Sequence, residues 1–206
     1  MQSLRLTAVA VVLAASLSAH AVPVTALPGS TTYAFPASNI FGAGPQTVAP
    51  GITWSSDFGS SVYGYTGSYG FLSNGGWNNL PMIGTNSASA TMRIDFASAV
   101  SGVGAFMNYA PAQGNLAVIA VYGAGNALLE SYSLNFSTGG GNNAGEFHGF
   151  LEGSSNIAYM TLTGSYIGAA NLQVVQAAPV PEPATYALVL GGLGALGFVA
   201  RRRKAA

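Results

Sequence analysis

Cysteine is absent from this 206-residue chain, and charged residues make up only 6% of it. Without cysteine the protein has no disulfide bonds, no zinc site built on thiolates and no thiolate nucleophile. The hydrophobic core must therefore supply the stability by itself. About 160 residues lie between two apolar terminal segments, enough for one domain that buries well over half of its unfolded surface.

Basic residues are also nearly missing from the middle of the chain. Five of the six Lys and Arg residues lie near the termini, at Arg5 and at positions 201–204, which leaves Arg93 alone. Five carboxylates accompany it between residues 22 and 178, so this part carries a net charge of −4. Because nucleic-acid binding depends on many Lys and Arg contacts to phosphates, we exclude nucleic acid as a partner.

Catalytic motifs are missing as well. The sequence has no G-x-S-x-G elbow and no H-E-x-x-H motif, and His148 is the only histidine after residue 21. Glu146, His148 and Glu152 would point to one face of an extended strand. At about 3.3 Å per residue the glutamate Cα atoms lie roughly 20 Å apart, whereas glycoside hydrolysis needs its two carboxylates roughly 5–10 Å apart. We expect a solvated strand face, and we predict no catalytic residue, no metal and no cofactor.

Residues 1–21 have the order of a secretory signal peptide. Arg5 precedes an apolar run over residues 6–17, and Ala19-His20-Ala21 follows as a small-x-small cleavage site. The run is shorter than a preferred membrane-spanning helix, although an uncleaved N-terminal anchor is the alternative. We predict removal of the signal peptide and a mature chain that begins near Val22.

The C-terminal segment, residues 179–206, has three parts. An uncharged apolar run over residues 184–200 separates a proline-rich entry from a basic cluster. The entry is Val180, Pro181, Glu182 and Pro183, and the cluster is Arg201, Arg202, Arg203 and Lys204. At about 1.5 Å per residue the run reaches about 25 Å, near the short limit for spanning a hydrocarbon core about 30 Å thick. We predict one transmembrane helix whose basic end stays in the cytoplasm.

This tail resembles the PEP-CTERM sorting signal of bacterial proteins, because the Pro181-Glu182-Pro183 triplet, the glycine-rich helix and the basic cluster occur in that order. The resemblance implies recognition in the inner membrane by an exosortase, a membrane-embedded relative of cysteine proteases and transpeptidases. The protein would then be released or passed outward. The transmembrane helix would be a transient anchor with a cytoplasmic C-terminus, and the mature protein would reach the cell surface or the extracellular matrix.

Residues 22–178 show the pattern of short β-strands. Ala90–Phe96 alternates most clearly, with apolar side chains on one face and Thr91, Arg93 and Asp95 on the other. Pro23–Gly51 is rich in Pro, Gly and Thr and predicts one irregular edge strand. Regular strand spacing predicts an all-β fold, an antiparallel β-sandwich of jelly-roll type.

Later segments continue this pattern. Val100–Tyr109 predicts a further strand, whose glycines at 102 and 104 allow close packing or a bulge. Residues 116–122 form a nearly continuous apolar run, typical of a central strand. A glycine-containing turn at residues 123–126 predicts a hairpin with residues 127–136.

Residues 94–175 also resemble the jelly-roll, carbohydrate-binding-like modules found ahead of this sorting signal. The segments that carry this resemblance include IDFASAVSGVGAFMNY, AVYGAGNALLESY and EFHGFLEGSSNIAYMTLTG. Such domains commonly place an acidic residue just before the last strand, where this chain has Gly168-Ala169-Ala170-Asn171. If that acid helps to hold a structural calcium ion in relatives, the resemblance implies weak binding or none here.

A group of aromatic residues offers the best candidate ligand contacts. Aromatic faces can stack on sugars, yet the same side chains are also typical of a small core, and both interpretations stay open. The group consists of Trp54, Tyr63, Tyr65, Tyr69 and Trp77.

These observations favour an exported, non-enzymatic protein with a structural or adhesive role at the cell surface or in exopolysaccharide. The alternative is a carbohydrate-binding, lectin-like module, and a secreted glycoside hydrolase ranks third. The expected partners are an exosortase-type membrane enzyme, the inner membrane during sorting, and exopolysaccharide. A groove lined by Trp54 or Trp77 would favour the lectin-like module, and converging carboxylates would favour the hydrolase.

Overall fold

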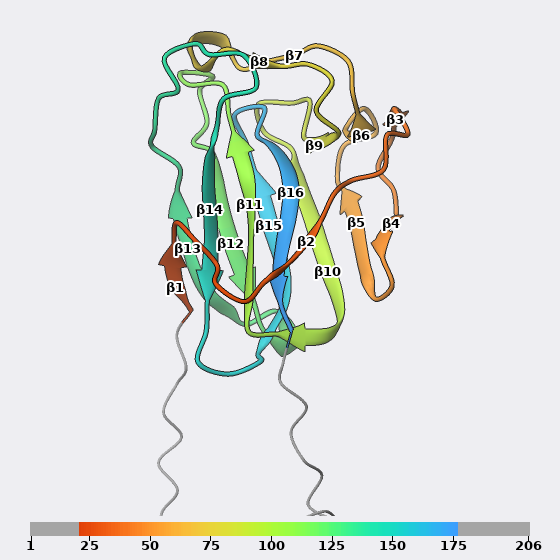
Figure 1. Cartoon of the computed structure of the whole chain (residues 1–206), viewed down its shortest axis with the longest axis vertical. Coiled ribbons are helices and arrows are strands. Elements are labelled where there is room, and N and C mark those ends of the chain that lie inside the picture. Colours follow the sequence, from red (N-terminus) through yellow and green to blue (C-terminus); the bar gives the residue numbers. More distant parts are fainter. Residues whose placement is uncertain (1–20, 177–206) are drawn as a thin grey trace, which may run out of the picture.

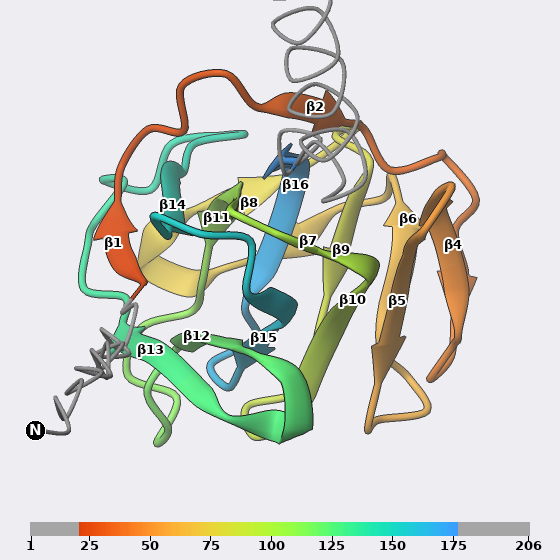
Figure 2. The ribbon, with the colours of Figure 1, turned by 90° about the horizontal axis from the view of Figure 1, so that it is seen from below.

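The computed structural model describes residues 21–176, which form two antiparallel β-sheets packed against each other (Figure 1 and Figure 2). All pairs between the named strands are antiparallel. The prediction of an all-β, antiparallel sandwich is therefore confirmed. The predicted signal peptide up to residue 20, the PEP triplet, the transmembrane helix and the basic cluster lie outside the described residues.

The larger sheet has eight strands, and its central members are long strands from the second half of the chain. One edge of β16 pairs with β11, while the other pairs with β9 near its start and with β2 near its end. In spatial order the strands are β1 (Val22–Val24), β14 (Glu146–Leu151), β11 (Gly102–Asn108), β16 (Gly168–Val175), β9 (Met82–Gly84), β6 (Val62–Tyr65) and β3 (Ile40–Phe41), with β2 (Thr31–Tyr33) beside β16.

The smaller sheet has six strands. In spatial order they are β13 (Leu128–Ser133), β12 (Val118–Tyr122), β15 (Ile157–Thr163), β10 (Thr91–Val100), β5 (Ile52–Ser56) and β4 (Gln46–Ala49). A separate two-stranded ribbon, β7 (Tyr69–Gly70) and β8 (Gly76–Trp77), encloses the 3-10 helix η1 (Leu72–Asn74). A second 3-10 helix, η2 (Ala124–Asn126), forms the predicted turn between β12 and β13.

The chain passes repeatedly from one sheet to the other. β10, β12, β13 and β15 belong to the smaller sheet, whereas β11, β14 and β16 belong to the larger one. The connections therefore cross the sandwich, as they do in jelly-roll folds. Because neighbouring strands come from distant parts of the sequence, the sheets bring together residues that the sequence separates widely.

Strand β10 shows why these residues form a sandwich. Met92 and Ile94 are fully buried in the main core, while Thr91 and Arg93 lie on the outer face of the sheet. An alternation of apolar and polar residues matches the period of two of a pleated strand, so one face is buried and the other stays wet. The predicted alternation over residues 90–96 is confirmed.

The main core lies between the two sheets. It combines side chains of the smaller sheet, such as Ile119 and Leu162, with side chains of the larger sheet, such as Phe150 and Leu172. A second buried cluster lies under the β7–β8 ribbon and contains Val62, Tyr69, Phe71, Trp77, Met82 and Ala170.

Gly104 allows β11 to pack closely against β14, as predicted from the sequence. A Cβ atom there would lie 2.5 Å from the ring of Phe147 and 2.8 Å from the carbonyl oxygen of His148. Such distances are far below ordinary van der Waals contact, so any larger side chain would push β14 away from β11.

Two predictions about strand boundaries were wrong. Residues 23–51 contain four short strands instead of one, because this segment supplies edge strands to both sheets. Val100–Tyr109 is not a single strand, since Ser101 separates β10 from β11, which lie in different sheets. Hydrophobicity alone does not reveal such a crossing, because the strands on both sides of it are apolar.

The two ends of the described chain lie at the same end of the sandwich. Figure 1 shows β1 beginning and β16 ending at the lower end, opposite the β7–β8 ribbon. Residues 21 and 176 therefore lie at one end of the described domain, opposite the β7–β8 ribbon.

Candidate ligand-binding surfaces

Four of the five aromatic residues proposed as ligand contacts are buried, Tyr69 among them at 7% exposure, and three are almost fully enclosed. Trp54 is 0% exposed, Trp77 is 1% exposed and Tyr63 is 2% exposed. Trp54 and Tyr63 pack on each other with ring centroids 5.3 Å apart. The groove lined by Trp54 or Trp77 that would mark a lectin-like module is therefore not present at these two residues.

Tyr63 and Trp77 have hydrogen-bond partners for their polar atoms, whereas the Trp54 indole N–H has none among the described residues. The Tyr63 hydroxyl donates to the Thr47 carbonyl at 2.6 Å, and the Trp77 indole N–H donates to the Ala144 carbonyl at 2.7 Å. Buried Tyr and Trp need such partners for their polar atoms. The aromatic stretch between residues 54 and 77 thus forms mainly packing, which is one of the two interpretations that the sequence left open.

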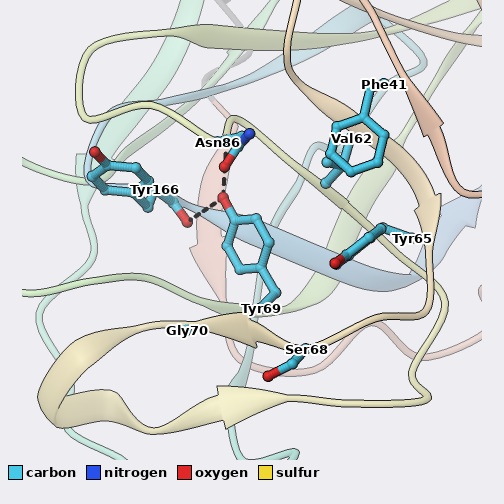
Figure 3. Close-up of a pocket in the computed structure, with 8 residues that line it drawn as sticks. All are labelled: Phe41, Val62, Tyr65, Ser68, Tyr69, Gly70, Asn86 and Tyr166. Atoms are coloured by element: carbon cyan, nitrogen blue, oxygen red, sulfur yellow. Dashed lines mark hydrogen bonds between the residues drawn. The ribbon is translucent and has the colours of Figure 1, made fainter.

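Tyr65 and Tyr69 do reach a pocket, of about 260 Å³, at the edge of the larger sheet (Figure 3). Tyr65 makes edge-to-face contacts with Phe41 and with Tyr69, at centroid distances of 5.5 and 6.5 Å. The pocket is lined by Phe41, Val62, Tyr65, Ser68, Tyr69, Gly70, Asn86 and Tyr166. Two of the five predicted residues therefore remain candidate ligand contacts.

The hydroxyl of Tyr69 is already satisfied within the protein. It accepts a hydrogen bond from the Asn86 backbone N–H at 2.9 Å and donates to the Tyr166 carbonyl at 3.3 Å (Figure 3). Burial raises the pKa of Tyr69 and keeps it neutral. The Tyr69 hydroxyl is consequently not free to orient a ligand, and the polar side chains left for that role in the lining are Ser68, Asn86 and the other tyrosines.

A second and larger hollow, of about 410 Å³, lies on the outer face of the smaller sheet. Four neighbouring strands, β12, β15, β10 and β5, supply most of its lining. We call it the tyrosine–arginine hollow, and it is lined by Ser55, Ser56, Asp57, Thr91, Arg93, Tyr122, Tyr159 and Thr161. It combines two tyrosines, one cation, one carboxylate and four Ser or Thr hydroxyl groups.

The aromatic pair in this hollow is a consequence of strand register. Tyr122 on β12 and Tyr159 on β15 are direct cross-strand partners, and their rings stack with centroids 4.6 Å apart at an angle of 11°. Stacked cross-strand aromatic pairs stabilise a sheet. Tyr159 is 7% exposed, so Tyr122 supplies most of the accessible ring surface. The Tyr159 hydroxyl donates to the Asn126 side chain at 3.0 Å.

Arg93 extends this surface across β10. Its guanidinium carbon lies 3.6 Å from the centre of the Tyr159 ring, in a cation–π arrangement, and its Nε donates to Asp95 Oδ1 at 2.7 Å. The hydrogen bond to Asp95 is the main cause that raises the pKa of Arg93. A cation held in this way has a fixed position beside an aromatic platform.

Sequence reasoning missed Tyr122 and Tyr159. Tyr122 ends an apolar run, and Tyr159 lies 37 positions further along the chain. The one available signal was the period of two of a strand. It directs the side chains of Tyr122 and Val121 to opposite faces of the sheet, and likewise those of Tyr159 and Met160. Only the register of β12 against β15 shows that the two rings meet.

The carboxylates of β14 do not form the solvated face that we expected. Glu146, His148 and Glu152 share a face with Phe150, which is fully buried, so that face points into the sandwich. The Tyr132 ring packs on both His148 and Phe150, at centroid distances of 6.0 and 5.3 Å. Only Glu146 is exposed, and Glu152 is buried.

His148 is held by aromatic side chains. Its ring stacks on Phe136 with a centroid distance of 5.0 Å, and the Tyr132 hydroxyl lies 3.1 Å from Nδ1. Glu146 Oε2 lies 3.4 Å from Nε2, too poorly placed for a hydrogen bond. Burial lowers the pKa of His148, so the imidazole is mainly neutral at pH 7. The two glutamates of the group are separated by His148 and Phe150, and they do not converge on a common site.

Other site types receive no support from residues 21–176. Within that range the structure brings together no group of three or more His, Cys, Asp or Glu side chains able to hold a metal ion. None of the helices described there combines the length and the apolar character that crossing a membrane requires.

The comparison with protein families gives a match in the C-terminal segment of the chain. Residues 179–204 match the family profile of the PEP-CTERM protein-sorting motif. This match confirms the resemblance that the PEP triplet, apolar run and basic cluster indicate. The motif implies a protein sorted to the cell surface by an exosortase-type enzyme.

No curated protein matches the chain at a significant level. Among solved structures, the lectin domain of lectinolysin in complex with Lewis B antigen is similar at a TM-score of 0.35 and 11% identity, covering 62% of this chain and 94% of that one. The CsCBM6-3 module of Clostridium stercorarium in complex with cellobiose is similar at a TM-score of 0.31 and 16% identity, covering 60% of this chain and 94% of that one.

Proposed function

We propose that the protein is exported across the inner membrane and sorted to the cell surface or exopolysaccharide matrix, where it has a non-enzymatic role. The single observation that carries this proposal is the sorting motif at residues 179–204. The predicted signal peptide at the other end supports export, because the two signals together define one route outward. In this proposal the C-terminal helix is a transient anchor, and residues 201–204 keep its end in the cytoplasm.

Replacement of the basic cluster tests the sorting proposal. Changing Arg201, Arg202, Arg203 and Lys204 to Gln removes the charges that oppose translocation of the helix end. We expect most of the protein to remain unprocessed at its C-terminus or to be misdirected, as read by cell fractionation and by mass spectrometry of the C-terminal peptide. Arg93→Gln is the matched control, because it removes a cation outside the tail and should leave processing unchanged. Unchanged processing of the quadruple variant would contradict the role given to the basic cluster.

A glycan-binding role is the second candidate, and the tyrosine–arginine hollow favours it. Stacked tyrosines supply an apolar platform, while Arg93, Asp57 and the hydroxyls around them supply hydrogen-bonding groups for sugar hydroxyls. Asp57 is the one carboxylate that lines the hollow, whereas most glycoside hydrolases use two. The hollow therefore suits binding better than hydrolysis.

Substitution of Tyr122 tests the glycan-binding role. In Tyr122→Ala the platform loses one of its two rings, and we expect affinity for the bound oligosaccharide to fall about fivefold, since an aromatic contact contributes roughly 1 kcal/mol beyond its buried area. The measurement is a glycan array followed by titration of the exported protein. Tyr65→Ala is the control, because it changes the pocket of Figure 3 instead. Loss of binding in Tyr65→Ala alone would place the site in that other pocket.

A further inference from the structure

Glu152 carries a buried carboxylate that has no partner. The residue follows β14 and is 4% exposed, and neither carboxylate oxygen has a hydrogen-bond partner among the described residues. An ionised carboxylate in such surroundings is strongly unfavourable unless a cation or several donors meet it. The Glu152 carboxylate is therefore a candidate partner for a cation.

The first strand of the domain lies beside this carboxylate. β1 pairs with β14, with Val22 opposite Leu151 and Pro23 opposite Phe150, and Figure 2 shows β1 next to β14 at the edge of the sandwich. Proline has no N–H, so the pair of Pro23 and Phe150 is the kind without hydrogen bonds. The alternation of an antiparallel ladder then makes Val22 and Leu151 a hydrogen-bonded pair.

A backbone contact on the other side of β14 agrees with this alternation. The Glu152 N–H points toward β11 and donates to the Ser101 carbonyl at 2.7 Å, so the polar groups of Leu151 point toward β1. The Val22 nitrogen consequently faces the Leu151 carbonyl group, which is bonded directly to the Glu152 nitrogen. A flexible glutamate side chain attached there can reach the Val22 nitrogen.

The side chain of Glu152 also lies on the matching face. Ala21 directly precedes β1 and is buried in the main core at 1% exposure. In antiparallel register Ala21 stands opposite Glu152, and opposite residues share a face of the sheet. Both residues are buried, so their side chains lie on the same inner face of the sheet. Loss of Ala21 would open space beside the Val22 nitrogen.

We propose that signal-peptide removal supplies the missing cation: the α-ammonium group of Val22 forms an ion pair with the Glu152 carboxylate in the mature protein. Water hydrolyses the peptide bond between Ala21 and Val22, the departing segment keeps the new carboxylate, and the Val22 amine takes up a proton at neutral pH. The proposal rests on the export route of the proposed function and on cleavage after Ala21. In this proposal the carboxylate gains its partner only when the signal peptide is removed.

Other cations fit this position less well. Arg93 is the only Lys or Arg between residues 22 and 178, and it lies on the outer face of the other sheet, paired with Asp95. A divalent ion needs several oxygen ligands, and the part of the chain that the structure describes forms no metal-binding group around Glu152. A single ammonium group can instead be held by one carboxylate and a backbone carbonyl.

Amine labelling tests the ion pair, because the chain has only one lysine, Lys204. The exported protein is treated at pH 7 with an N-hydroxysuccinimide ester, and acylation of the Val22 amine is followed by mass spectrometry of the N-terminal peptide. Only the unprotonated amine reacts, and each unit by which the ion pair raises its pKa slows the reaction about tenfold. We expect labelling to be about tenfold slower in the wild type than in Glu152→Gln, and equal in both after denaturation.

Two further variants complete the experiment. Glu146→Gln removes the same charge from the exposed end of the same strand, and it should label as slowly as the wild type. An alanine inserted between Ala21 and Val22 moves the ammonium group away from Glu152, and it should label faster even if Glu152→Gln folds poorly.

Three results would overturn the proposal. They are equal labelling of folded wild type and Glu152→Gln, an N-terminus other than Val22 in the exported protein, and protection that disappears when EDTA removes calcium. None of these results affects C-terminal processing, so failure of the ion pair is distinguishable from failure of the sorting proposal.

Discussion

Replacing Trp77 with alanine is expected to lower the free energy of unfolding by about 3–5 kcal/mol, the usual loss for a large aromatic residue removed from a core. Trp77 stacks on Phe106 with ring centroids 5.5 Å apart and meets the edge of Phe71 at 5.0 Å. For a domain of this size, such a loss lowers Tm by roughly 6–20 °C. The measurement is urea and thermal unfolding of the exported protein.

Most of that loss should come from packing. The Ala144 carbonyl that accepts the Trp77 indole N–H also accepts the Asn108 side-chain amide at 2.9 Å, so the carbonyl keeps a partner after the substitution. Trp77→Phe retains an aromatic ring in the cluster and should cost clearly less than Trp77→Ala. If Trp77→Ala unfolded like the wild type but lost sugar binding, Trp77 would be a ligand contact after all, and its placement in the core would be wrong.

Gly64→Ala is expected to destabilise the protein by about 3 kcal/mol or more. Gly64 has a φ of +60°, and a Cβ atom there would lie 1.9 Å from the Pro36 carbonyl oxygen. A non-glycine residue forced into an unfavourable backbone region costs roughly 1–3 kcal/mol, and overpacking against rigid atoms adds roughly 1–3 kcal/mol. The opposing atom belongs to the backbone, so a rotation of a side chain cannot relieve the clash.

The structural role of Gly64 explains why the segment would not simply adjust. Gly64 lies at a register irregularity in β6, between Tyr63 and Tyr65, and its carbonyl accepts the N–H groups of Ser38 and Asn39, both at 3.0 Å. Gly59→Ala is the matched control. Gly59 has nothing within 4 Å of its Cβ position and no positive φ, so its substitution should change stability by less than about 1 kcal/mol. Equal stability of both variants by chemical denaturation would contradict this account of β6.

The period of two in the sequence predicted the fold class, and β10 shows why it could. Each residue of a strand is directed to a face by its own position, so Met92 and Arg93 reveal a buried side and a wet side without any knowledge of neighbouring strands. The hairpin at residues 123–126 was predictable for a similar reason, because glycine in a short turn is a local requirement. Crossings between sheets, such as the one at Ser101, depend on tertiary packing and were missed.

The candidate site was predictable only in part. Tyr65 and Tyr69 reach a pocket, but Trp54, Tyr63 and Trp77 proved to be buried. A large aromatic side chain favours the core and a binding surface alike, so residue type cannot separate the two.

By itself, the sequence determined where this protein is directed, its net charge and its all-β class, because these properties depend on residue type, order and local period. The sorting motif at residues 179–204, for example, is recognised from the type and order of its residues. Tertiary structure alone decided that Tyr122 meets Tyr159, and that Glu152 lies buried beside the start of β1. Both features depend on the register between strands that are distant in the chain, which many cooperating contacts set together.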